Sequence, residues 1–212
     1  GLGDVYKRQT QNLLGKTKMA LVVDQGDDTE LFHLNTKVEE QGLQYYNSTV
    51  GHPPLKEHTP TLRQWAALFP RIFDQQGTPY ADFAVWLPFD ENLGKELKYL
   101  LWKQVGLGEY QQVERSGPNN LLQWTASWMV FRVALIGLGV AAPGALDAYL
   151  ATFERFLEDF PEAWGMICEA EDHRRRHESL NIRREIEVAY YQGHHWASRF
   201  NPERPWECVC LL

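Results

Sequence analysis

Cysteine is scarce in this chain of 212 residues, and its distribution excludes a disulfide-stabilised fold. There are three cysteines, and two of them, Cys208 and Cys210, lie close together at the C-terminal end, far from Cys168. An odd number in this arrangement forms no paired framework. Because no signal peptide is visible either, we expect a reducing intracellular compartment, with cytoplasm and nucleus left open.

Positive charge is also in deficit. The chain has 21 Lys and Arg residues against 28 Asp and Glu residues, a net charge of -7 and a pI near 5.5. Nucleic-acid-binding surfaces usually combine clustered Lys and Arg with a high pI, so binding of nucleic acid through charge is disfavoured. Hydrophobic residues make up 44% of the chain, which is enough to bury a core.

Complete catalytic motifs are missing as well. Leu13 to Lys18 holds the Gly-Lys-Thr that ends a phosphate-binding loop, but Thr10 stands where that loop needs its first glycine. His173 and His177 have the spacing of paired zinc ligands on a helix, but Arg174 occupies the place of the expected glutamate. We therefore predict that the protein is not an enzyme and has no catalytic residues, cofactor or metal.

The N-terminal segment divides into two parts. Back-translated, Asp4 to Gln9 fits GAT GTG TAT AAG AGA CAG, and the segment resembles a translated sequencing-library transposase adapter. Residues 1–9 are therefore interpreted as an adapter-derived artefact. Residues 10–58 are polar and rich in turn residues, and they are predicted to form a flexible, disordered leader. Met19 to Val23 would form a strand only with a partner.

Residues 59–192 show the apolar spacing of a helical domain. Thr61 to Gln64 fits a capping box, and Pro70 is expected to kink or split the helix that follows. Residues 78–89 fit either a short helix or an extended segment, and of the two the helix is preferred. Glu91 to Lys103 is predicted to be a second helix, and Tyr110 to Val113 one short strand.

Leu121 to Val140 is the most apolar stretch of the chain. Arg132 lies near its centre and argues against a membrane span, because an arginine there costs about 2.5 to 3.5 kcal/mol. A helix that is apolar on nearly every side is typical of the middle of a bundle. We predict an all-α bundle of about five helices around this segment, with Arg132 at an edge or paired with a carboxylate. Ala145 to Phe160 is predicted to be the next helix.

The C-terminal part of the domain contains a purely polar segment. Glu171 to Ser179 has no apolar residue, so it is predicted to project into solvent as a helix that continues to Tyr191. The ion pairs expected to support it join Glu171 to Arg175 and Asp172 to Arg176. Residues 193–212 are predicted to form an irregular, truncated tail.

Three consecutive arginines in this segment are the candidate nucleic-acid contact. Arg174, Arg175 and Arg176 could make a weak RNA contact. Five arginines and six carboxylates lie between Glu169 and Glu187, however, so the local charge nearly cancels. Arginine-rich binding helices act by releasing counterions from many phosphates, which a self-compensating segment does poorly.

Four stretches taken together carry a family resemblance. They are PYADFAVWLPF (79–89), residues 117–156, WGMICEAEDHRRR (164–176) and FNPERPWECV (200–209). Their order and aromatic positions resemble multicopy open reading frames of dinoflagellate transcriptomes, some of which look retroelement-derived. The resemblance implies a gag-like helical region that precedes a Cys- and His-rich segment in a longer protein that handles RNA.

Two functions follow from these patterns. The abundant apolar helical faces and the missing catalytic sets favour a non-enzymatic helical interaction or assembly module, a fragment of a longer chain that binds a protein partner or itself and not a membrane. The alternative is an RNA-associated, gag-like structural protein whose nucleic-acid-binding residues lie outside this fragment.

Overall fold

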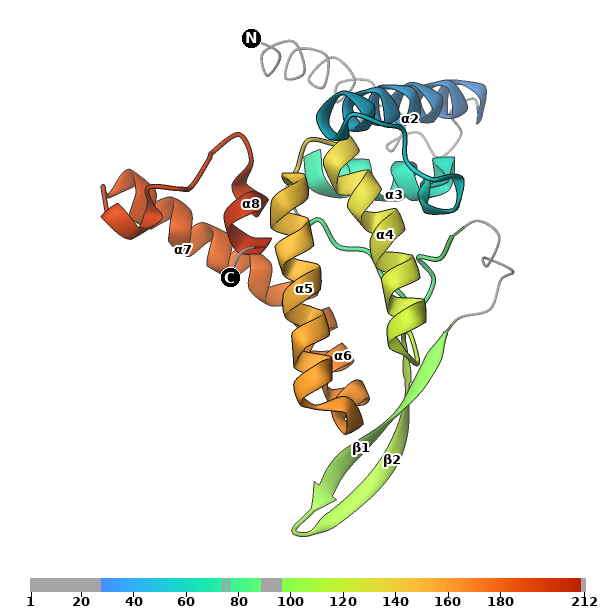
Figure 1. Cartoon of the computed structure of the whole chain (residues 1–212), viewed down its shortest axis with the longest axis vertical. Coiled ribbons are helices and arrows are strands. Elements are labelled where there is room, and N and C mark those ends of the chain that lie inside the picture. The colour runs from blue at the N-terminus through green and yellow to red at the C-terminus, as the bar shows by residue number, and fades with distance from the viewer. Residues whose placement is uncertain (1–27, 74, 76, 89–96, 211–212) are drawn as a thin grey trace.

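The computed structural model describes residues 28–73, 75, 77–88 and 97–210 (Figure 1). The described chain is mostly helical and carries one two-stranded antiparallel sheet, so the all-α prediction is wrong in that respect. The helices are α2 (Asp28–Val50), α3 (Leu62–Phe73), α4 (Leu121–Gly137), α5 (Pro143–Asp159), α6 (Trp164–His173), α7 (Ser179–Tyr191) and α8 (Pro205–Cys210). The short turns of helix are η1 (Lys56–His58), η3 (Pro161–Ala163), the π-helical η4 (Arg174–Glu178) and η5 (His195–Ala197).

The predicted capping box at the start of α3 is confirmed. The backbone N–H of Thr61 donates to Oε1 of Gln64 at 2.8 Å, and the backbone N–H of Gln64 donates to Oγ1 of Thr61 at 3.3 Å. Both residues thereby satisfy N–H groups that a helix start leaves unpaired. The helix is not split at Pro70, since α3 continues through the proline to Phe73.

The flexible leader predicted for residues 10–58 is wrong from residue 28 onward. Residues 28–50 form α2, which packs across α3 and α4 and buries Val38 and Tyr46. The crossing is close: a Cβ atom added at Gly137 of α4 would lie 2.8 Å from the carbonyl oxygen of Gly42 in α2 and 2.7 Å from the Trp65 ring. The possible strand at residues 19–23 lies outside the described residues.

The helix predicted for residues 91–103 is wrong from residue 98 onward, where a β-hairpin begins, and residues 91–96 lie outside the described residues. β1 (Lys98–Gly106) pairs with β2 (Glu109–Ser116), and Leu101 stands opposite Val113. Tyr99 and Leu101 are buried while Leu100 is exposed, which is the two-residue period of a strand with one covered face. The predicted short strand around residues 110–113 is confirmed as the middle of β2.

The apolar stretch that begins at residue 121 forms α4, and its aromatic side chains pack on α5. The ring of Trp124 stacks on Phe153, and the ring of Trp128 stacks on Tyr149 at 4.9 Å between centroids. Arg132 donates from Nε and Nη2 to the two carboxylate oxygens of Asp147 at 2.8 and 3.1 Å, so the predicted pairing with a carboxylate is confirmed. Within the described ranges, no helix has the length and apolar character needed to cross a membrane.

The predicted projection of residues 171–179 into solvent is wrong for Glu171 and Arg175, whereas His173 and residues 176–178 are exposed. Glu171 and Arg175 have side chains only 5% and 7% exposed, and they form the predicted ion pair inside the protein. The helical path continues without a break from α6 through η4 into α7, which extends away from α5 (Figure 1). Glu171 and Arg175 face inward because they pair with each other, and because Arg175 also donates to the carbonyl oxygen of Ala81.

The irregular tail predicted for residues 193–212 contains a helix. Phe200 and Trp206 are buried, and α8 packs against both α5 and α7 (Figure 1). The guanidinium of Arg183 also lies over the Trp206 ring, 5.2 Å from its centroid. Burial of two large aromatic side chains holds this end of the described chain on the helical body.

Candidate functional site

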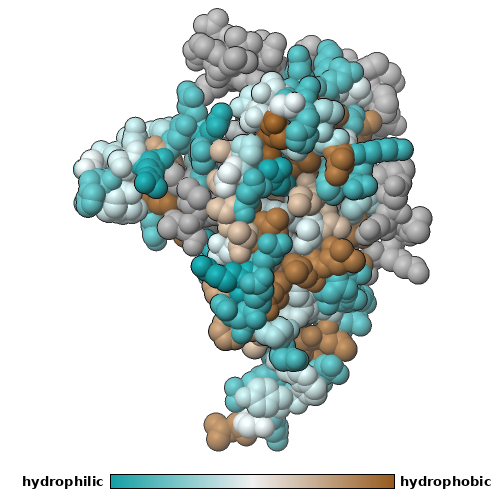
Figure 2. Space-filling model, in the orientation of Figure 1, coloured by the Kyte–Doolittle hydropathy of each residue, from teal (hydrophilic) through white to brown (hydrophobic). Residues whose placement is uncertain are grey.

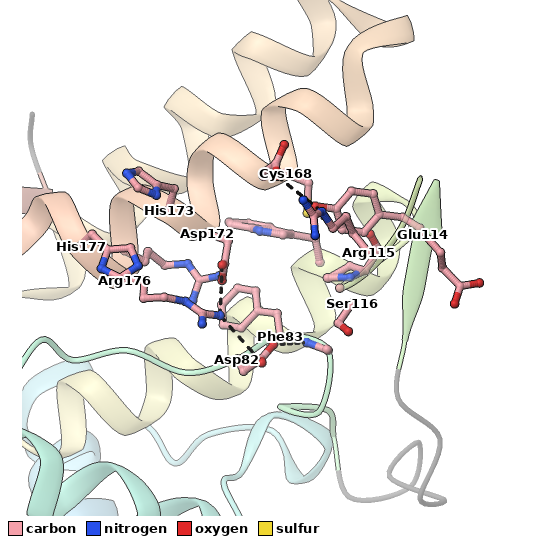
Figure 3. A pocket seen from close by; sticks show the side chains of 17 residues that line it. Asp82, Phe83, Glu114, Arg115, Ser116, Cys168, Asp172, His173, Arg176 and His177 are labelled. Atoms are coloured by element: carbon pink, nitrogen blue, oxygen red, sulfur yellow. Dashed lines mark hydrogen bonds and ion pairs between the residues drawn. The ribbon is translucent and has the colours of Figure 1, made fainter. Parts of the chain in front are cut away.

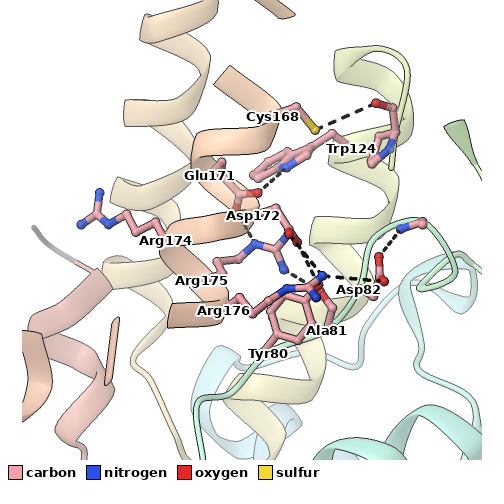
Figure 4. A network of polar contacts seen from close by, with 12 residues as sticks. Tyr80, Ala81, Asp82, Trp124, Cys168, Glu171, Asp172, Arg174, Arg175 and Arg176 are labelled. Carbon is pink, nitrogen blue, oxygen red and sulfur yellow. Dashed lines mark hydrogen bonds and ion pairs between the residues drawn. The ribbon is translucent and has the colours of Figure 1, made fainter. Parts of the chain in front are cut away.

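A buried ion pair lies where η4 faces residues 78–88 (Figure 4). Arg175 donates from Nε to Oε1 of Glu171 and from Nη1 to the carbonyl oxygen of Ala81 at 2.6 Å. The same carboxylate accepts the Trp124 indole N–H at 3.2 Å and the Tyr149 hydroxyl at 3.0 Å. Both buried charges therefore have several hydrogen-bond partners, which is the condition for a buried ion pair to persist.

The electrostatics of this cluster keep the Arg175 guanidinium charged. Burial, the largest single cause, lowers the pKa of Arg175, but Glu171, Tyr149 and Asp172 together raise it above its ordinary value. Burial, followed by the Glu171 carboxylate, raises the pKa of Tyr149 well above its usual range. Tyr149 consequently stays a neutral hydrogen-bond donor to the carboxylate.

Residues 78–88 are held in an extended and turn conformation by this cluster. The Arg175 guanidinium lies over the Phe83 ring, 3.8 Å from its centroid, and that ring meets Trp124 and Phe131 edge-on at 5.7 Å each. The Asp82 carboxylate accepts the backbone N–H two residues later at 3.0 Å. The short helix preferred from the sequence is therefore wrong: residues 78–88 are extended with a turn at residues 83–85.

A second arginine extends the network to the surface. Arg176 donates to the Tyr80 hydroxyl and lies 3.3 Å from Asp172 and 4.0 Å from Asp82. The Tyr80 hydroxyl in turn donates to Asp172 at 2.9 Å. Burial is the largest cause that raises the pKa of Tyr80, and the two carboxylates add to it, so the hydroxyl keeps its proton.

The structure separates the three arginines predicted as RNA contacts. Figure 4 shows Arg174 pointing away from Arg175 and Arg176, and its guanidinium lies 5.8 Å from the centroid of the Tyr149 ring. Arg175 is buried, and Arg176 is exposed but placed between two carboxylates. The three side chains do not form one cationic surface.

A polar cavity of about 430 Å³ opens beside this network (Figure 3). It is bounded by the base of the hairpin, residues 82–84, the start of α4 and the α6–η4 junction. Figure 3 shows Asp172 and Arg176 converging in the cavity and Glu114 turned outward, away from Arg115. Arg115 lies 3.6 Å from Glu169. The charges of the cavity are therefore largely paired with one another.

Two groups that line this cavity, the Cys168 thiol and the Tyr99 hydroxyl, are held in their protonated forms. Burial, with a smaller effect of the Glu171 carboxylate, raises the pKa of the Cys168 thiol to about 12. Burial is also the largest cause that raises the pKa of Tyr99. A thiol with so high a pKa is unreactive at neutral pH, because the thiolate is the nucleophile. The cavity can accommodate a polar molecule but does not activate the groups described here.

The paired histidines lie on the rim of the same cavity. The rings of His173 and His177 are 5.0 Å apart between centroids, and His173 lies 3.8 Å from Glu178. The predicted helical spacing thus brings the two rings together. Within the described residues, no group of three or more His, Cys, Asp or Glu side chains is arranged to hold a metal ion.

An apolar groove of about 450 Å³ lies on the outside of α5 and α6. Phe156, Phe160 and Met166 line it, and each is about half exposed or more. Arg174 and Tyr149 lie at one end of it. Residues of this kind on facing helices leave an apolar surface in contact with water.

The hairpin carries several exposed apolar side chains, among them Leu107, the most exposed large apolar side chain of the described residues. It projects beyond α6 (Figure 1), and Figure 2 shows hydrophobic surface at its far end. Leu107, in the turn, has a relative exposure of 105%. Leu100, Trp102 and Tyr110 are 58%, 64% and 62% exposed and belong to one face, because their register places them on the same side of the pleat.

The opposite face of the hairpin anchors it to α6. Tyr99 and Leu101 are buried on that face. A Cβ atom added at Gly165 of α6 would lie 3.1 Å from both the Leu100 carbonyl oxygen and Leu101 Cδ1, so helix and strand are in close contact. Sequence reasoning missed both faces, since Leu97, Leu100 and Leu101 fit a helical stripe as well as a strand. The alternation from residue 98 to residue 102 is one of burial and not of residue type, because Tyr99 to Trp102 are all apolar, so the sequence carries no two-residue period here.

Comparison of the chain with protein-family models, with curated proteins and with solved structures found no match. The resemblance to dinoflagellate open reading frames stays a prediction. The function is accordingly argued from the geometry of the cavity, the groove and the hairpin.

Proposed function

We propose that this chain is an interaction module that binds another protein chain through its projecting β-hairpin. The observation that carries the proposal is the set of large apolar side chains on this one element, each more than half exposed: Leu100, Trp102, Val105, Leu107 and Tyr110. Contiguous exposed apolar surface on a folded protein is characteristic of an interaction site. A two-stranded hairpin is also only marginally stable alone and gains from added partners.

The base of the hairpin supports this role because it is held firmly. Tyr99 and Leu101 are buried at the base, and Gly165 permits close contact with α6. The buried pair of Glu171 and Arg175 fixes the end of the same helix against Ala81. A binding element that is already ordered loses less conformational entropy on association than a loose one.

The helical body is proposed to be a scaffold built around α4. This is supported by the complete burial of Trp124, Val130 and Ala134, and by the packing of α2 and α5 against the same helix. The polar cavity does not favour an enzyme, because Cys168 and Tyr99 keep their protons and the neighbouring charges are paired. Binding through the exposed hairpin is the function this arrangement supports best.

The test compares two triple variants with the same residue types. Leu100→Thr/Trp102→Thr/Tyr110→Thr removes the hairpin face with residues that favour strands. The control, Leu122→Thr/Trp196→Thr/Tyr191→Thr, removes one exposed Leu, Trp and Tyr from helical regions. Association is followed by sedimentation velocity over a wide concentration range and by capture of binding proteins on the immobilised chain.

We expect the wild type and the control to associate with themselves or with a captured protein. The hairpin variant should bind at least about tenfold more weakly, which corresponds to about 1.4 kcal/mol. A hairpin variant that binds as tightly as the control would contradict the proposal. So would a wild-type chain that is monomeric at every concentration and captures nothing.

A further inference from the structure

The exposed edge of β2 matches a second copy of itself. We infer that two copies of this chain associate by antiparallel pairing of β2 with β2 about a two-fold axis through Gln112. The inference rests on the proposed function, because it names the partner of the hairpin as a second copy. It also adds a register, which makes it testable residue by residue.

The edge is available for such pairing. β2 pairs with β1 on one side, and in the described part of the chain no third strand continues the sheet. β1 is the strand that packs on α6, while every side chain of β2 except Val113 is exposed. The free edge of a strand of eight residues presents unpaired backbone N–H and C=O groups, which readily accept another strand.

The charges of β2 select the partner and the direction. The strand reads Glu109-Tyr-Gln-Gln-Val-Glu-Arg115, with opposite charges at its two ends. Antiparallel self-pairing centred on Gln112 places Glu109 of each copy opposite Arg115 of the other, so two ion pairs form. Parallel in-register pairing would place Glu109 opposite Glu109, and like charges directly opposite each other are destabilising.

The same charges select the register. A shift by one residue or two in either direction removes Arg115 from its position opposite Glu109. In the centred register, Tyr110 of one copy stands opposite Glu114 of the other. Leu100 is the cross-strand neighbour of Glu114 within each hairpin. Tyr110 of one copy and Leu100 of the other therefore lie in the same row across the joined sheet. The exposed apolar faces of the two hairpins thus join on one side of a four-stranded sheet, and three or more strands are what a stable sheet needs.

Arg115 is free enough to take part. It pairs with Glu169, with Nε 3.6 Å from Oε1, and the two side chains are 43% and 48% exposed. A guanidinium has five N–H donors, so it can bind a second carboxylate. Glu109 lies at the far end of the strand, next to Gly106, and therefore meets Arg115 only across two copies.

A charge exchange tests the pairing. Glu109→Arg puts two arginines at each end of the proposed interface, and Arg115→Glu puts two carboxylates there. Each single variant should raise the dimer dissociation constant about tenfold in sedimentation velocity at low salt. The double variant Glu109→Arg/Arg115→Glu should return to within about threefold of the wild type. The carboxylate introduced by Arg115→Glu still repels Glu169 of its own chain in the double variant, so the recovery arises between copies.

Cysteine cross-linking tests the register with a second readout. In a background with Cys208→Ser and Cys210→Ser, Gln112→Cys lies on the two-fold axis and should form a disulfide-linked dimer on mild oxidation. Gln111→Cys is the control, because it faces the second copy's Val113 and should cross-link at least about tenfold more slowly. Equal cross-linking of the two variants, or none, overturns the register.

The outcomes separate this inference from the proposed function. If the double exchange does not recover association, or the wild type stays monomeric, self-pairing through β2 is overturned. If the immobilised wild type nevertheless captures a protein that the hairpin threonine variant loses, the hairpin still binds another chain and the proposed function stands. If neither association nor capture depends on the hairpin, both are overturned.

Discussion

The guanidinium of Arg175 donates to the carboxylate of Glu171 one helical turn earlier, and both side chains are buried. The pair joins α6 and η4 to Ala81, Trp124 and Tyr149, which belong to three other segments of the chain. Removing one charge from such a pair leaves the other buried without compensation, whereas replacing both with apolar side chains is often tolerated.

The first prediction concerns this pair. Glu171→Ala should lower the free energy of unfolding by about 3 to 5 kcal/mol, because it strands the Arg175 charge. Glu169→Ala removes a half-exposed carboxylate that also pairs with an arginine, and it should cost about 1 kcal/mol or less. Urea denaturation measures both.

A double substitution distinguishes the cost of an unpaired buried charge from the cost of lost side-chain volume. Glu171→Met/Arg175→Met should be less destabilised than Glu171→Ala, since no unpaired charge remains. Equal losses in Glu171→Ala and Glu169→Ala would show that the buried pair does not hold these segments together.

The second prediction concerns the crossing of α2 and α4. Gly137→Ala should destabilise the protein by about 1 to 3 kcal/mol, because the new methyl group would meet the Trp65 ring and the Gly42 carbonyl oxygen within 3 Å. Gly144→Ala in α5 meets nothing within 4 Å and should be neutral or stabilising by up to about 1 kcal/mol. Thermal unfolding of the two variants gives the comparison, and a harmless Gly137→Ala would mean that α2 does not lie against α4.

The third prediction is a loss of stability at alkaline pH. The pKa of Cys168 is about 12 in the folded protein against 9.0 for an ordinary thiol, so only the unfolded chain loses this proton as the pH rises above 9. The stability that the buried thiol contributes is complete below pH 9 and is lost between pH 9 and about 12. Over that range the free energy of unfolding falls by up to about 1.4 kcal/mol per pH unit.

Cys168→Val provides the control for that slope. It should reduce the fall in the free energy of unfolding above pH 9 and leave the value at pH 7 within about 1.5 kcal/mol of the wild type. Denaturation curves at a series of pH values measure both quantities. An unchanged alkaline slope in this variant would mean that the thiol is not buried as described.

Local patterns with a direct physical mechanism could be predicted from the sequence. The Thr61 and Gln64 capping box depends on residues three apart, and the apolar composition of residues 121–137 favours a helix whatever surrounds it. Arg132 inside that run needed a carboxylate, and Asp147 supplies it. Each of these features follows from a few neighbouring residues or from a strong local requirement.

The features that position the candidate site depend on contacts between distant residues. Glu171 to Ser179 contains no apolar side chain, so the sequence indicates an exposed helix. Its buried arginine, Arg175, however, pairs with Glu171 and donates a hydrogen bond to the Ala81 carbonyl, about ninety residues earlier. α2 packs with few apolar residues because Gly42 and Gly137 allow a close crossing. The hairpin face was missed because leucines at 97, 100 and 101 also fit a helix.

Amide hydrogen exchange along β2 tests the central claim most directly, because it reports the hairpin edge itself. Alternate amides of residues 109–115 should become more protected as the protein concentration rises, while the amides of α7 should not change. The Glu109→Arg variant should lose this dependence. The hairpin would not be the binding element if exchange along β2 were the same at every protein concentration and also unchanged by a captured protein.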